Sequence, residues 1–146
     1  MLMLPSTHVR LLRASGVLLL LLGIVHLAAT PHISTLIRHS TSPGVADRLT
    51  PPMLLNHVLV GVLLLPFGCL MLYAAPHSAT GVPWAQVLVR TTAVTVAALP
   101  VTLLALMGVR YFQAPLFVLG FALVTAAAVT LLVVAFSSPR DRGTNI

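Results

Sequence analysis

The sequence predicts an all-α integral membrane protein, a four-transmembrane-helix up-down bundle. The first observation behind this prediction is composition: 58% of the 146 residues are hydrophobic and 7% are charged, against about 25% charged residues in a soluble domain. The second is the presence of long apolar runs, each able to cross a hydrocarbon layer of ~30 Å as a helix. Short links between these runs favour antiparallel neighbours. We therefore expect one membrane domain over residues 1–146.

The apolar runs set the expected boundaries of the spans, which are residues 14–31, 53–74, 85–107 and 116–136. A basic start followed by an apolar run can be a secretory signal, but no convincing small-residue cleavage site follows, so we expect a retained first span. Residues 32–52 combine His32, Arg38, His39, Asp47 and Arg48 with proline and Gly44. This composition predicts an outer connecting loop that can hold a short interfacial helix over Ile33 to Arg38, and a natural place for partner contacts. Residues 137–146 are expected to form a polar cytoplasmic tail.

The charge pattern predicts topology and lipid contact. All eight basic residues are arginines, and with two aspartates they give a formal net charge of +6. Five arginines fall on the side of the termini and three on the other side, so both termini are predicted to be cytoplasmic. We expect the inner membrane of a bacterium as the location. Arginines at span ends indicate contact with anionic lipid, and no nucleic-acid partner is expected.

Helical spacing places two histidines on packing faces. Small and polar residues recur at intervals of three and four in the first three spans. These stripes are Gly16, Leu19, Gly23, His26 and Thr30; His57, Gly61, Leu64 and Gly68; and Thr91, Thr95, Ala98 and Thr102. His26 and His57 each lie five residues inside a proline, which is roughly 8 Å below the same outer boundary. We therefore expect both imidazoles to point into the bundle in one layer.

This layer is the candidate ligand site of the sequence. His26 and His57 are candidate axial ligands of haem b, or metal ligands together with His32. Arg110 and Tyr111 approach from the same side, where an arginine can hold a haem propionate and a tyrosine can hydrogen-bond a quinone carbonyl. The alternative is that both histidines only join helices through hydrogen bonds. His8, His39 and His77 are expected to be solvated.

The layout resembles that of the small cytochrome membrane anchors of respiratory complexes. The resemblance is architectural: it covers the four-span layout together with His26 and His57, and no ligand assignment follows from it. No motif supports a specific ligand.

Missing residue types exclude several functions. The sequence has no Glu, and neither Asp47 nor Asp141 lies in a span, which argues against classical proton antiport. Cys69 is the single cysteine, so an internal disulfide is impossible. Walker, GxSxG, HExxH and Rossmann patterns are also absent, and we expect no catalytic activity.

The expected function is that of a noncatalytic accessory or structural subunit of a membrane complex, whose partners are the lipid bilayer and other membrane subunits. The alternative is a haem- or quinone-binding electron-transfer subunit that uses His26 and His57. A transporter of a small solute or lipid is the third possibility.

Overall fold

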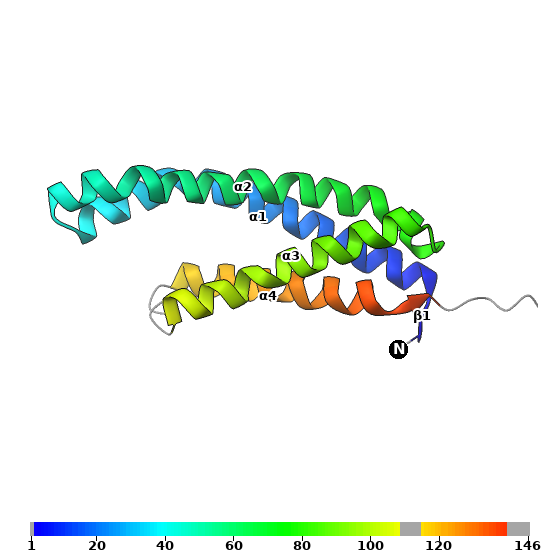
Figure 1. Ribbon diagram of the computed structural model, residues 1–146. Coiled ribbons are helices and arrows are strands. Elements are labelled where there is room, and N and C mark those ends of the chain that lie inside the picture. The colour runs from blue at the N-terminus through cyan, green and yellow to red at the C-terminus, as the bar shows by residue number, and fades with distance from the viewer. Residues whose placement is uncertain (1, 109–114, 140–146) are drawn as a thin grey trace, which may run out of the picture.

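The computed structural model describes residues 2–108 and 115–139, and these form an antiparallel helix bundle (Figure 1). The helices of the described chain are α1 (Pro5–Ser40), α2 (Pro43–Ala79), α3 (Pro83–Met107) and α4 (Pro115–Phe136). Each contains an apolar stretch long enough to cross a membrane, which confirms the predicted fold class. Two-residue strands β1 (Leu2–Met3) and β2 (Ser138–Pro139) pair in parallel and bring the two ends of the described chain together.

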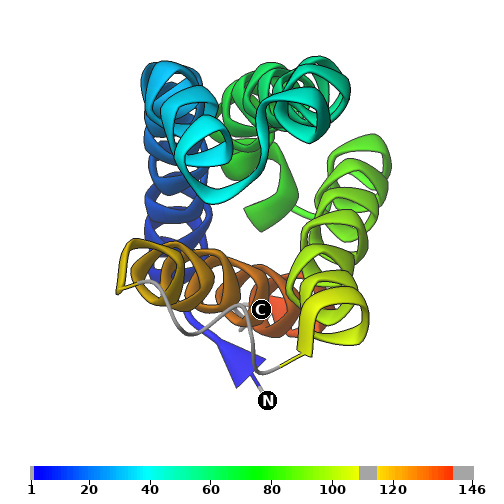
Figure 2. The same cartoon turned by 90° about the vertical axis from the view of Figure 1, so that its left-hand side faces the viewer.

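The helices form a ring in which each packs against its neighbours in the chain and α4 returns to α1 (Figure 2). The most extensive contact is between α1 and α2. We call the end that holds β1, β2 and the α2–α3 turn the termini end, and the opposite end the far end. At the far end, α1 and α2 continue well past α3 and α4 (Figure 1).

The expected outer loop at residues 32–52 is wrong, because the structure makes nearly all of it helical. Only Thr41 and Ser42 separate α1 from α2, so residues 32–52 form the tip of a helical hairpin, which we call the hairpin tip. Pro43 occupies the first turn of α2, where a missing N–H is not needed.

Prolines inside the helices also do not interrupt them. Pro31 lies within α1, and Pro51 and Pro52 lie within α2. Each is preceded by a threonine in the same turn: Thr30 Oγ1 donates to the His26 carbonyl at 3.2 Å, and Thr50 Oγ1 donates to the Ala46 carbonyl at 2.7 Å. These bonds do not replace the ones that proline removes, because Pro31 frees the carbonyl of Leu27 and Pro51 frees that of Asp47.

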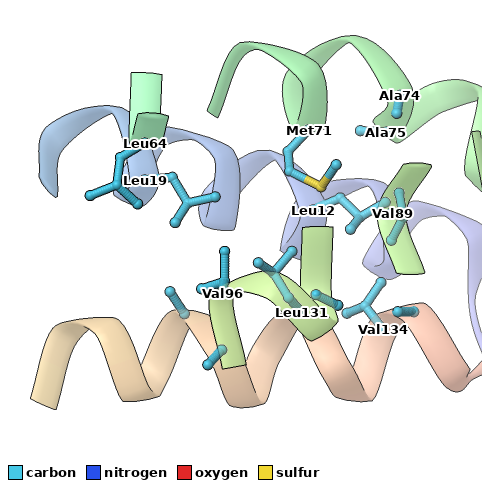
Figure 3. Close-up of a cluster of buried hydrophobic side chains, with 14 of the residues drawn as sticks. Leu12, Leu19, Leu64, Met71, Ala74, Ala75, Val89, Val96, Leu131 and Val134 are labelled. Atoms are coloured by element: carbon cyan, nitrogen blue, oxygen red, sulfur yellow. The ribbon is translucent and has the colours of Figure 1, made fainter. Parts of the chain in front are cut away.

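The hydrophobic core occupies the termini end. Side chains from all four helices meet there (Figure 3). The largest fully buried side chains are Leu12, Leu19, Met71, Leu131, Val89, Val96 and Val134, together with Thr92. Towards the far end, fewer buried side chains join the α1–α2 pair to the α3–α4 pair. Leu106 near the end of α3 is 81% exposed. The bundle is therefore closed at one end and splayed at the other.

Two glycine pairs hold α1 against α2. A Cβ added to Gly16 would lie 3.0 Å from the Gly68 carbonyl oxygen, and one added to Gly23 would lie 3.0 Å from the Gly61 oxygen. The two pairs lie seven residues apart along both helices. A repeat of seven residues is typical of helices that pack with a left-handed supercoil. The glycines of the first two predicted stripes therefore lie at a close helix contact, as predicted.

The third predicted stripe does not face the bundle. Thr91, Thr95 and Thr102 are exposed, while α3 buries its neighbouring face, which includes Val89 and Ala93. Thr95 Oγ1 donates to the Thr91 carbonyl at 2.9 Å. Because a threonine can satisfy its hydroxyl on its own helix in this way, it can face lipid, and hydroxyl spacing alone does not identify a packing face.

Candidate functional site

His26 and His57 meet across the α1–α2 interface. Their rings are stacked, with centroids 4.3 Å apart and an interplanar angle of 25°, and both side chains are half-buried. The glycine contact positions them: His26 lies three residues after Gly23, and His57 lies four residues before Gly61. Because Gly23 and Gly61 bring the backbones together, the next turn of each helix places an imidazole on the same side of the interface.

One nitrogen of this pair lacks a hydrogen bond. The Nε2 atom of His57 is buried and has no partner among the described residues. A buried polar atom without a partner costs about 1–3 kcal/mol. The pair therefore holds one unsatisfied group inside a membrane span, where water is not available to pair with it.

A haem between the two rings does not fit this geometry. A bis-imidazole haem lies between its ligands, and each ring directs a nitrogen at the iron. Here the rings face one another at 4.3 Å, and the carbonyl of Gly61 would lie 3.0 Å from a Cβ on Gly23 one turn away. Opening that space for a macrocycle would require α1 and α2 to separate.

The wider metal set predicted from the sequence does not assemble either. His32 is exposed, and six residues after His26 it lies on a different face of α1. Among the described residues, no group of three or more His, Cys, Asp or Glu side chains is placed to hold a metal ion. Among the described residues, a metal ion bound beside the stacked rings would therefore have the imidazoles of His26 and His57 as its ligands.

Arg110 and Tyr111, the other predicted cofactor contacts, lie outside the described residues. Their expected roles on a haem propionate or a quinone carbonyl stay predictions.

One buried polar residue, His8, was not predicted from the sequence. This side chain was expected to be solvated, but it is buried and its Nε2 lies 3.2 Å from Ser78 Oγ on α2. A signal for its burial exists in the sequence. The buried residues Leu19, Ser15 and Leu12 recur at helical spacing along α1, and one further step of four residues reaches His8.

No family model, curated protein or solved structure matches the chain. The physical features of the chain itself therefore carry the functional conclusions below.

Proposed function

We propose that the protein is a noncatalytic accessory subunit of a membrane complex, and that its hairpin tip is the docking site for the partner. The observation that carries this proposal is the projection of the hairpin tip beyond α3 and α4 (Figure 1). Helix α1 has 36 residues, or ~54 Å, whereas the hydrocarbon layer needs ~30 Å. Residues 32–40 of α1 belong to the hairpin tip, and at about 1.5 Å per residue they place roughly 14 Å of helix outside the bilayer.

The surface of the hairpin tip suits a protein partner. The hairpin tip buries Ile37, Ala46 and Thr50 and so has a small packed interior. It nevertheless leaves Leu36, Val45 and Leu49 exposed, at 41–46% of their surface. Outside the hydrocarbon layer these apolar side chains meet water, and apolar groups beside arginines are typical of interface residues.

The test is a comparison of complex size. The triple variant Leu36→Ser, Val45→Ser and Leu49→Ser should reduce the native-gel size of the solubilised protein to that of the free chain. A control variant, Val87→Ser, changes an exposed apolar residue near the termini end and should leave the complex intact. If the triple variant migrates with the wild-type complex, or the wild type is itself a free chain, the proposal is wrong.

We propose further that both termini lie in the cytoplasm of a bacterial cell and that the hairpin tip lies on the outer face of the inner membrane. The arginine distribution supports this orientation, since basic residues favour the cytoplasmic side. A C-terminal fluorescent-protein fusion should fluoresce, and a C-terminal alkaline phosphatase fusion should be inactive. The reverse pattern would place the hairpin tip in the cytoplasm.

A two-histidine metal site is the second candidate function. The observation that favours it is the unpaired Nε2 of His57 beside a second imidazole. Imidazole lone pairs lie in the ring plane, so metal binding would require the stacked rings to tilt open towards a shared ion. Metal analysis of the purified protein should then show copper or zinc that His57→Leu abolishes and His32→Ala retains. Equal metal content in these two variants would remove this candidate.

A further inference from the structure

A polar cavity lies at the termini end, far along the helices from His26 and His57. Its volume is about 220 Å³, and residues of all four helices line it. Its polar and aromatic lining side chains are His8, Ser78, Gln86, Arg90, Phe136 and Ser137. This set combines one permanent cation with amide, imidazole and hydroxyl groups, all of which can donate hydrogen bonds.

His8 lines this cavity and has a buried ring nitrogen without a partner among the described residues. The side chain is 2% exposed, and its Nδ1 is buried without a partner among the described residues. Its Nε2 lies 3.2 Å from Ser78 Oγ. When the serine hydroxyl donates to Nε2, the neutral ring carries its proton on Nδ1, and this N–H is then a donor with no acceptor. The ring therefore has a hydrogen-bonding capacity that its protein neighbours do not use.

Arg90 supplies a positive charge that has no carboxylate partner among the described residues. Its Nε donates to the Ala135 carbonyl at 3.3 Å, and its guanidinium carbon lies 5.9 Å from the centre of the Phe136 ring. The acidic side chain within the described residues is Asp47, which lies in the hairpin tip at the other end of the molecule. The remaining guanidinium N–H groups are thus available to an anion from outside the described chain.

An aromatic cluster places this cavity at the level of lipid headgroups. Tyr73, His77 and Trp84 gather at the α2–α3 turn, with ring centroids 5.2–5.6 Å apart. Tyrosine and tryptophan concentrate at the membrane–water interface. Gln86, which lines the cavity, lies two residues after Trp84 on α3. At the level of the headgroups, the phosphate of a phospholipid is an anion that can reach this cavity.

We propose that this cavity binds a phosphate-type anion, either the phosphodiester of an anionic phospholipid or inorganic phosphate. The planar guanidinium of Arg90 matches the oxygens of a phosphate group, which it can contact through two parallel N–H bonds. Gln86 and Ser137 line the same cavity and add neutral donors. Phe136 is exposed beside the guanidinium and presents an apolar surface to an acyl chain.

The test compares two arginines at the same end of the molecule. Arg90→Gln removes the charge from the cavity, while Arg13→Gln removes the same charge from an exposed α1 position that does not line it. Native mass spectrometry would measure retention of phosphatidylglycerol and of phosphatidylcholine by the full chain. A separate titration would measure the binding of inorganic phosphate.

We expect Arg90→Gln to weaken phosphatidylglycerol retention at least tenfold and Arg13→Gln to change it less than twofold. If Arg90→Gln instead weakens only the binding of inorganic phosphate, the free anion is the ligand. Equal losses in Arg90→Gln and Arg13→Gln would show general surface attraction and overturn the proposal. The proposal is also wrong if the wild type retains phosphatidylglycerol and phosphatidylcholine equally and binds no inorganic phosphate.

Two further variants separate binding from folding, because Arg90 also bonds the last turn of α4. Arg90→Lys keeps the charge but loses the planar fork, and we expect a few-fold loss of binding with an unchanged melting temperature. His8→Phe keeps an aromatic ring at this position and removes both ring nitrogens, and we again expect a few-fold loss. Wild-type binding in both of these variants would contradict the proposed contacts.

Discussion

The termini end and the hairpin tip are both helical, yet different interactions stabilise them. At the termini end four helices bury Leu12, Met71 and Leu131 completely. At the hairpin tip two helices bury a much smaller set of side chains and leave Leu36 and Leu49 exposed. The difference teaches that the four helices share a buried core at one end of the bundle, while the two helices at the other end leave apolar side chains exposed.

The largest expected effect is at the glycine contacts that join these two regions. A Cβ at Gly68 would lie 2.6 Å from Leu20 Cγ and 2.8 Å from the Gly16 carbonyl oxygen. Because the backbone oxygen cannot move without separating the helices, Gly68→Ala should lower the free energy of unfolding by about 3 kcal/mol. Unfolding in detergent micelles measures this change. As the matched control, Gly120→Ala places its Cβ in open space and should cost nothing.

A second substitution measures the core of the termini end directly. Leu131 is fully buried and Leu106 is 81% exposed, so the same change to alanine at each site compares the two regions. Leu131→Ala should cost about 2 kcal/mol, near the lower limit for buried leucines, because lipid replaces water as the surroundings of the unfolded spans. Leu106→Ala should cost less than about 0.5 kcal/mol. Similar melting temperatures for the two variants would contradict the division of the bundle.

A third substitution should stabilise the bundle. Thr125 on α4 has a buried Oγ1 without a partner among the described residues. Thr125→Val removes this hydroxyl at nearly constant volume and should raise the free energy of unfolding by about 1 kcal/mol. Thr95→Val, in which the hydroxyl is already bonded to the Thr91 carbonyl, should give no such gain. A lower melting temperature for Thr125→Val would mean that its hydroxyl has an acceptor.

The smallest effect on stability should come from the hairpin tip. Leu36→Ser together with Leu49→Ser changes exposed side chains and should alter the free energy of unfolding of the free chain by no more than about 0.5 kcal/mol. A thermal melt of the purified single chain measures this change. A large loss would mean that these leucines pack within the chain, and it would weaken the case for docking at the hairpin tip.

Much of the fold was predictable because a bilayer restricts the possible structures. The four spans follow from apolar length alone, and the Gly23 and Gly61 stripes follow from the need of membrane helices for small contact residues. The common level of His26 and His57 also follows from counting along two antiparallel helices. Counting residues along the helices does not predict the orientation of the two imidazole rings. Because these rings are stacked, there is no room for a haem between them.

The errors came from reading polar composition as irregular structure. Proline and charge in residues 32–52 predicted a loop, but Pro43 lies in the first turn of α2, where its missing N–H is not needed, and α2 continues through Pro51 and Pro52. His8 was predicted to be solvated because it lies near the start of the sequence. The pairing of α1 with the end of α2, which puts it against Ser78, is a tertiary contact that the local sequence does not encode.

The two-residue turn at Thr41 and Ser42 also governs how the chain enters the bilayer. With so short a connection, neither α1 nor α2 can cross the membrane far from the other. The glycine contacts then need no later helix, since each partner is supplied by the hairpin itself. We therefore expect α1 and α2 to insert during synthesis as one unit and to present a finished surface on which α3 and α4 assemble.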